Sequence, residues 1–382
     1  MRALRCAVVA SFLSATAIVS AQPVTVLATG LEHPMKLTLT RRGNLLVAEN
    51  GVEKNSGRVS LVDRSGKRRT IIDGLPSGLS SPNNDPDGVS GMEVRDRTLY
   101  IVIGEGDAIR PGTKPGTQVP NPDGVSSPIL SSVLRLRLDS EIDRLSGAFR
   151  LKPEHHWTLA DGNIVNLTSD AGDKATIEVF TDFRDSVPDP NTIYRNSHPF
   201  GIAFTPASPN VAFVVDAGQN ALWVVNTATG RQRLLTRFAP LKAIAPGPPF
   251  IDAVPTSVRM WEGQLLVTLL TGFPFAPTQS RVMTVDPRTG ASSLFIVGLN
   301  SAIDIAVRPT GTERPQFWVL EFSANQSARP PLPGRLLRYD TAQGSVVVND
   351  LVTPTSMVLD PDTREIFISE MATGVIKQMK IQ

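Results

Sequence analysis

The chain of 382 residues contains one cysteine, Cys6, which lies within its first 21 residues. Disulfides, a cysteine nucleophile and a cysteine-ligated metal are therefore excluded for the rest of the chain. Only 19% of the residues are charged, and 38 Lys and Arg against 36 Asp and Glu leave a formal net charge of +2. Because no segment gathers positive charge, the sequence offers no electrostatic basis for binding nucleic acid or an anionic membrane.

Several catalytic signatures are also missing. The sequence has no G-x-S-x-G elbow, no H-E-x-x-H pair and no phosphate-binding loop, so nothing supports a serine nucleophile. Gly and Pro, by contrast, are frequent at 29 and 31 residues, and 41% of the chain is hydrophobic. This composition allows a substantial core and is typical of a protein made of many short strands and turns.

The first 21 residues have the pattern of a secretory signal peptide. Arg2 and Arg5 precede a short apolar stretch, and the small residues Val19-Ser20-Ala21 end it. We expect cleavage after Ala21, which removes Cys6 and leaves a mature chain, residues 22–382, that is exported to the periplasm or the medium. No other stretch is long and apolar enough to span a bilayer, so the mature chain is expected to be soluble.

One phrase of β-forming residues recurs six times along the chain. The copies are spaced about fifty residues apart, apart from one interval about twice as long. A short strand opened by a small or Pro-containing turn precedes each copy, and an alternating strand and a fourth strand generally follow it. The six copies end at Glu49, Ile103, Asp216, Leu269, Glu321 and Glu370.

Four short strands in each unit are typical of a propeller blade. We therefore predict an all-β fold, a single six-bladed β-propeller over residues 22–382. The sixth unit ends at its third strand, and the N-terminal strand Val24–Leu27 supplies the missing partner. This pairing closes the ring and removes an exposed sheet edge.

The long interval contains an insertion at about residues 106–190. It begins with a stretch rich in Pro, Gly and Asp over 109–128 that is typical of a loop. Strands are expected at 133–138 and 175–180, and a short amphipathic helix over 140–149. A functional cover and a tolerated insertion are both consistent with this pattern.

Acidic residues end the second strand in four of the six units, at Glu49, Asp216, Glu321 and Glu370. Strands close to the propeller axis can converge on one channel, where carboxylates could hold a divalent cation, the one cofactor that the pattern indicates. Asp and Glu at strand ends also cap turns. The sequence leaves both interpretations open.

Other candidate binding residues are expected at the mouth of the channel. His33 and His198 occupy equivalent places directly before a Pro at the start of an innermost strand, where a histidine acts as a base, as a ligand or as a structural donor. Asn220 lies in the turn after Asp216. Phe273 and Phe275 flank a proline on an inter-strand loop, and rigid aromatic side chains are suited to making contacts.

Several phrases of the sequence resemble the ScyD/ScyE family. They are Gly30-Leu31-Glu32-His33-Pro34, Gly57-Arg58-Val59, the stretch from Asp216 to Leu222, and Val254-Pro255-Thr256-Ser257 followed by Thr271-Gly272-Phe273-Pro274-Phe275. The resemblance covers nearly the whole mature chain and implies an exported six-bladed propeller related to NHL-repeat and gluconolactonase-like folds. Named members belong to gene clusters for scytonemin, an indole-phenol pigment. The longer, His-containing insertion departs from the family.

Two classes of function fit these observations. The first is a binding or scaffold module that holds a small ligand, or a protein, at the channel mouth. The second is an enzyme of the six-bladed class, either a metal-dependent lactonase or a quinone-dependent sugar dehydrogenase. The ligand and the oligomeric state are not fixed by the sequence.

Overall fold

The computed structural model describes residues 23–80, 84–113, 118–183, 196–206, 208–242, 249–308, 315–340 and 343–381. The expected signal peptide, residues 1–21, lies outside the described residues.

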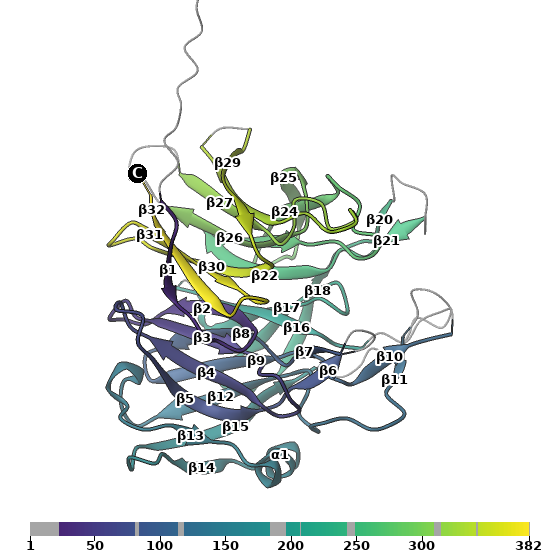
Figure 1. Ribbon diagram of the computed structural model, residues 1–382. Coiled ribbons are helices and arrows are strands. Elements are labelled where there is room, and N and C mark those ends of the chain that lie inside the picture. Colours follow the sequence, from purple (N-terminus) through teal and green to yellow (C-terminus); the bar gives the residue numbers. More distant parts are fainter. Residues whose placement is uncertain are drawn as a thin grey trace, which may run out of the picture.

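The described residues form six large sheets, which are the blades of a β-propeller (Figure 1). The first strand of each blade contacts the first strand of the next, and β30 contacts β2, so the ring is closed. Blades 1 to 3 consist, from the axis outwards, of β2 (Pro34–Leu39), β3 (Leu45–Glu49), β4 (Gly57–Val62) and β5 (Arg68–Leu75); β8 (Val89–Arg95), β9 (Thr98–Ile103), β12 (Ser132–Leu138) and β15 (Lys174–Asp182); and β16 (Pro199–Thr205), β17 (Ser208–Asp216), β18 (Ala221–Asn226) and β19 (Gln232–Arg237).

The same order of strands is found in the second half of the ring. Blades 4 to 6 consist of β22 (Pro255–Trp261), β23 (Gln264–Leu269), β24 (Ser280–Val285) and β25 (Ser292–Leu299); β26 (Ala302–Arg308), β27 (Gln316–Glu321), β28 (Gly334–Tyr339) and β29 (Ser345–Leu351); and β30 (Pro354–Asp360), β31 (Glu365–Glu370), β32 (Val375–Lys380) and the N-terminal β1 (Thr25–Ala28). The predicted fold class and the closing role of the N-terminal strand are therefore confirmed, since Thr25 pairs with Gln378 and Val26 with Lys377.

The insertion differs from the expectation in two places. A hairpin of β10 (Ile109–Pro111) and β11 (Gln118–Pro120) lies within the stretch predicted as a loop. The predicted helix over 140–149 is wrong. This stretch contains a 3₁₀ helix, Ile142–Arg144, and the first residue of β13 (Phe149–Arg150), and α1 begins only at Pro153 (Pro153–Ala160).

Side-chain acceptors explain why the chain does not continue as a helix. Asp173 Oδ2 accepts hydrogen bonds from the backbone N–H groups of Ser146 and Gly147, at 2.9 Å each. Asp170 Oδ1 accepts the next N–H, from Ala148, at 2.8 Å. These groups are thereby satisfied outside a helix.

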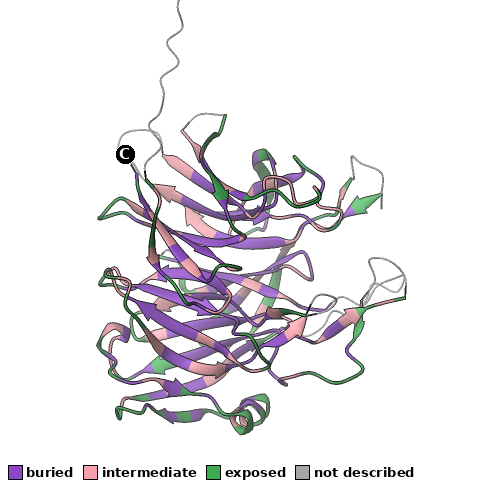
Figure 2. Ribbon diagram, in the orientation of Figure 1, coloured by how far each residue is buried: buried purple, intermediate pink, exposed green. Residues whose placement is uncertain are grey.

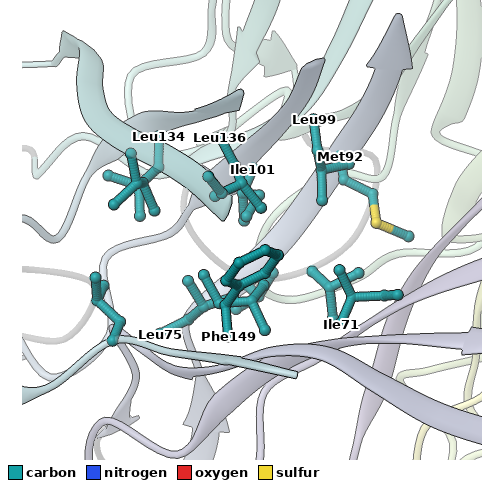
Figure 3. Packing of buried hydrophobic residues seen from close by; sticks show 14 of the residues in the cluster. Ile71, Leu75, Met92, Leu99, Ile101, Leu134, Leu136 and Phe149 are labelled. Carbon is teal, nitrogen blue, oxygen red and sulfur yellow. The ribbon is translucent and has the colours of Figure 1, made fainter. Parts of the chain in front are cut away.

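The insertion covers the outer edges of two blades. β13 pairs in parallel with β5 of blade 1, and β14 (Val165–Thr168) pairs antiparallel with β15 of blade 2. Phe149 of β13 is fully buried and belongs to one apolar cluster with Ile71 and Leu75 of blade 1 and Leu134 of blade 2 (Figure 3). Buried residues continue along the inner strands of the whole ring (Figure 2).

A single carboxylate, Asp304 of β26, ties four inner strands together at the axis. It accepts hydrogen bonds from Lys36 Nζ at 2.9 Å, from Arg259 at 3.0 Å and from Ser257 and Ser356 at 2.6 and 2.9 Å. Asp304 is fully buried. Burial alone would raise the pKa of Asp304, but the charges of Arg259 and Lys36 hold it well below the usual value of 3.8. We call these five residues the axial cluster.

Each fourth strand contains a bulge at an equivalent place. The extra residue is Leu27, Ile71, Phe180, Leu235, Phe295 or Val347. In three cases its carbonyl oxygen faces a glycine in the turn between the third and fourth strands of the following blade. A side-chain carbon on Gly66, Gly230 or Gly290 would lie 2.1, 2.0 or 2.3 Å from the oxygens of Leu27, Phe180 and Leu235.

The axial cluster leads to a first prediction. Replacing Asp304→Ala leaves the buried cations Lys36 and Arg259 without their shared partner, so the free energy of unfolding should fall by about 3 kcal/mol or more. Urea unfolding followed by circular dichroism measures this. The control is Asp340→Ala, which removes a half-exposed pair with Arg338 and should cost about 1 kcal/mol or less. Equal losses in the two variants would contradict the prediction.

The inter-blade glycines lead to a second prediction. Gly290 and Gly263 both have positive φ, +76° and +77°, but only Gly290 has a neighbour within 4 Å of an added side-chain carbon. Gly263→Ala should therefore cost about 1 kcal/mol from backbone strain alone. Gly290→Ala should cost about 2 kcal/mol more, because the strand of blade 3 must move. Thermal and urea unfolding of the two variants test this difference, and equal costs would refute the contact.

Candidate functional site

One face of the ring carries the longer connections. At this face, which we call the loop face, the first strand of each blade begins and the second strand ends. Three hairpins project from it, on the right of Figure 1. They are β6 (Gly78–Ser80) with β7 (Asp85–Asp87), β10 with β11, and β20 (Leu241–Lys242) with β21 (Phe250–Ile251).

Between blades 2 and 3, the loop face brings together three titratable side chains. His198 directly precedes β16, Asp87 ends β7, and Glu105 lies two residues after β9. His198 Nε2 is 3.5 Å from Asp87 Oδ1, and His198 Nδ1 is 3.6 Å from Glu105 Oε1. The three side chains are 13 to 20% exposed, so they are largely buried but can be reached from solvent. We call them the mouth trio.

Glycines allow the trio to assemble. Asp87 Oδ2 accepts a hydrogen bond from the backbone N–H of Gly106 at 2.7 Å. A side-chain carbon on Gly104 would lie 2.8 Å from His198 Nε2 and 3.0 Å from Asp87 Oδ1. Any larger residue at position 104 would therefore push the imidazole and the carboxylate apart.

The electrostatics of the trio favour a charged imidazole. Burial acts to lower the pKa of His198, but the charges of Asp87 and Glu105 outweigh it and raise this pKa well above the usual 6.5. Burial likewise acts to raise the pKa of Asp87, while His198 and the backbone of Gly106 hold it below its usual value. With His198 protonated and both carboxylates ionised, the trio has a net charge of −1.

An apolar side chain, Phe200, lies beside the trio and belongs to a larger apolar cluster. The Phe200 ring is 5.6 Å from the His198 imidazole. Phe200, Leu270 and Phe322 are only partly buried, and they pack against a core cluster that includes Ile303. These residues come from blades 3, 4 and 5. The charged trio and the Phe200 ring therefore lie next to each other.

The four strand-end acids have a common structural role, each within its own blade. Each accepts a hydrogen bond from a backbone N–H group just before the first strand of its own blade. The donors and distances are Glu32 to Glu49 at 2.6 Å, His198 to Asp216 at 2.9 Å, Asn300 to Glu321 at 2.6 Å and Val352 to Glu370 at 2.7 Å. All four acids are buried, each in a different blade, so the structure does not bring them together.

A second partner holds each of these carboxylates. Arg58 contacts Glu49, Ser197 contacts Asp216, Arg335 contacts Glu321, and Lys377 contacts Glu370. Burial raises the pKa of Asp216, opposed by the Ser197 hydroxyl, and raises the pKa of Glu321, opposed by Arg335. These contacts are those of turn-capping side chains, one of the two roles that the sequence left open.

The remaining sequence candidates lie apart from one another. His33 Nδ1 is 2.9 Å from the Gly51 carbonyl oxygen in blade 1. Asn220 donates to Asp252 Oδ1 and accepts from the Val254 N–H, both at 2.8 Å, and so joins blade 3 to blade 4.

The two aromatic candidates form a pair on the loop after β23. Phe273 is 67% exposed and makes an edge-to-face contact with Phe275, whose ring centroid is 6.3 Å away. Of the predicted residues, only His198 belongs to the mouth trio. Asp87 and Glu105 were not predicted.

The geometry of the trio bears on metal binding. Its two carboxylates face opposite ring nitrogens of His198, so one ion cannot be bound by all three side chains through these contacts. In the described segments, no group of three or more His, Asp or Glu side chains is arranged to hold a metal ion. No described helix is long and apolar enough to cross a membrane.

The raised pKa of His198 leads to a third prediction. A raised folded-state pKa stabilises the protein below the unfolded value of 6.5, and this contribution is lost as the pH rises through the folded-state pKa. The melting temperature of the wild type should therefore exceed that of His198→Gln most near pH 6, and the gap should narrow in alkali. A constant gap between pH 6 and pH 10 would show that His198 is not held as an imidazolium.

No family model matches the chain, and no curated protein matches it. Solved structures with a similar fold include a candidate phosphatase from Bacteroides thetaiotaomicron, 8% identical over 93% of this chain and 72% of that chain, with a TM-score of 0.50. A candidate 6-phosphogluconolactonase from Bacteroides uniformis is 12% identical over 92% and 82%, with a TM-score of 0.46. The virginiamycin B lyase of Staphylococcus aureus is 13% identical over 94% and 99%, with a TM-score of 0.44. At such low identity, the similarity concerns the β-propeller fold alone.

Proposed function

We propose that the protein is an exported, ScyD/ScyE-like binding module that holds a small ligand at the mouth of its loop face. The observation that carries this proposal is the contact between the mouth trio and the partly buried ring of Phe200, 5.6 Å from the His198 imidazole. Ligand sites commonly combine an apolar lining with a few convergent polar groups. The resemblance of the sequence to the ScyD/ScyE family and the pattern of residues 1–21 support the proposed family and export.

The charges indicate what kind of ligand the mouth prefers. Two carboxylates around one imidazolium leave a net negative charge, which attracts a cation or a hydrogen-bond donor and repels an anion. An aromatic body would pack against Phe200. The described connections on this face also contain more acidic than basic residues. The acids are Glu32, Glu53, Asp85, Asp87, Glu105, Asp107, Asp123 and Asp252, and the bases are Lys54, Arg110, Lys242 and Arg329.

The proposed ligand is therefore an aromatic amine or a similar aromatic donor. The charged partners of His198 are both carboxylates, which distinguishes this site from one built for phosphate or carboxylate groups, since Arg residues usually bind those. The resemblance to a family connected with an indole-phenol pigment supports an aromatic body. A protein partner at the same face, with Phe273 as a contact, is the other form of the binding hypothesis.

The enzymatic alternative has less support. A metal-dependent lactonase would need converging ligands, whereas the strand-end acids are dispersed among four blades. A quinone-dependent sugar dehydrogenase would need polar groups for its cofactor, and the polar groups of the axial cluster are already paired with one another. Metal analysis of the purified protein, with lactone and aldose turnover before and after Glu49→Gln, tests this alternative.

Ligand preference provides the fourth prediction. Tyramine and 4-hydroxyphenylacetate share a phenol ring and differ in the sign of their charge, so calorimetric titration of each compares the effect of charge alone. Tyramine should bind at least about tenfold more tightly, a difference of about 1.4 kcal/mol. Asp87→Asn and Phe200→Ala should each weaken its binding by a similar factor.

A matched control keeps this test specific. Glu262 is an exposed acid in a turn at the opposite face, so Glu262→Gln should leave tyramine binding unchanged. Stronger binding of the anion, or equal effects of Asp87→Asn and Glu262→Gln, would overturn the proposed ligand class. Absence of binding by both compounds would overturn the small aromatic ligand.

A further inference from the structure

The outer edges of the blades are not equally protected. The insertion covers blades 1 and 2 with β13 and β14. In the described residues, β19, β25, β29 and β1 are the last strands of their sheets in blades 3 to 6. A bare edge strand presents backbone N–H and C=O groups that can pair with another chain. Proteins usually protect it with β-bulges, with charged residues, with Pro or by making it short. Every outer strand here has a bulge, so the last three protections distinguish the four edges.

One of these four edges lacks all three protections. β19 contains Arg233 and Arg237, β29 contains Asp350, and β1 has only four residues. The eight residues of β25, Ser-Ser-Leu-Phe-Ile-Val-Gly-Leu, include no charge and no Pro. Its pairing with β24 has two irregularities, the bulge at Phe295 and a second register shift between Ile296 and Leu299. The other outer strands have a bulge equivalent to the first, and β5 and β29 also have a second shift.

The bulge determines which side chains of β25 are exposed. Phe295 and Ile296 both turn towards blade 5, where the Phe295 ring lies 4.9 Å from that of Phe317. Leu294 and Val297 are consequently left on the other side of the strand, 58% and 59% exposed. Two large apolar side chains are thus exposed on an unpaired edge strand, where a partner strand could cover both.

We propose that β25 is a self-association edge, through which two copies of this chain pair antiparallel about a two-fold axis. An axis at the centre of the Phe295–Ile296 peptide places Leu294 beside the partner's Val297, and Val297 beside the partner's Leu294. The contact is then identical on both subunits, as a two-fold interface requires. The paired blades would form one continuous eight-stranded sheet.

Charge is the reason for choosing a second copy as the occupant. A strand without charge pairs most favourably with another uncharged strand, because no charged group must be desolvated. The β25 strand of a second copy is uncharged, whereas β19 or β29 of a second copy would bring Arg or Asp to the interface. The net charge of +2 on 382 residues gives little repulsion between copies. Two outer strands of the same chain already pair with an additional strand: β5 pairs with β13, and β15 pairs with β14.

Sedimentation velocity over a range of concentrations tests the dimer and gives the fifth prediction. The wild type should sediment as a dimer at 100 µM, and Leu294→Lys or Val297→Lys should raise its dissociation constant at least about tenfold, because a lysine would face the partner. The matched control is Leu234→Lys on β19, which already contains arginines and should behave as the wild type. Circular dichroism confirms that each variant is folded.

The register has its own test. In a Cys6→Ser background, a mixture of Leu294→Cys and Val297→Cys chains should form a disulfide-linked dimer under oxidation, while each variant alone should not, since directly opposed residues lie within disulfide reach. A wild type that is monomeric at every concentration overturns the proposal, as does a dimer that survives both lysine substitutions. Cross-linking of either cysteine variant with itself overturns the register. Ligand binding at the mouth does not enter any of these outcomes.

Discussion

The ring depends on one buried carboxylate. Asp304 receives two cations and two hydroxyl groups that come from blades 1, 4 and 6, so four of the six inner strands are joined at a point near the axis. Inner strands of a propeller diverge from the axis and leave space that an apolar side chain from one blade fills poorly. An ion cluster suits this place because four strands contribute to it, and because each member is hydrogen-bonded to Asp304.

Repetition in the sequence was a reliable guide to the fold. The recurring phrase marked the second strand of every blade, and its surroundings located the first and third strands, because each blade must bury the same kind of surface against its neighbours. The strand-end acids recur for a similar reason: each holds the backbone at the start of its own blade. The insertion could not be predicted in this way. Phe149 looked like part of an amphipathic helix, but it pairs with blade 1, because long-range burial and the acceptors Asp170 and Asp173 decide its conformation.

The candidate site, by contrast, consists of residues that depart from the repeat. Glu105 occupies a position where the other blades have Gly51, Gly218, Thr271, Ser323 and Ala372. Asp87 ends the β6–β7 hairpin, which lies between blades 1 and 2; the one described hairpin at the equivalent place, β20–β21 between blades 3 and 4, ends at Ile251. A search for shared features therefore led to the capping acids and to His198, and it missed both carboxylates beside that histidine. Asp87, Glu105 and His198 lie in three different connections between strands, so the sequence does not show that they meet. Their meeting also requires the absence of a side chain at Gly104, which no local sequence pattern indicates.

The contacts between bulges and glycines all run in the same sense around the ring, from the outer strand of one blade to a turn of the next. In blades 1, 3 and 4 the turn between the third and fourth strands rests on the outer strand of the blade before it, so a longer turn there would collide with its neighbour. In blade 2 this turn has become the insertion, and its glycine contact is replaced: Arg69, beside the bulge of blade 1, donates to the carbonyl oxygen of Ile142 at 3.0 Å, and β13 pairs with the same strand. Natural variation in chain length should therefore concentrate at this connection. A related protein that had lost the insertion would need a glycine in its place.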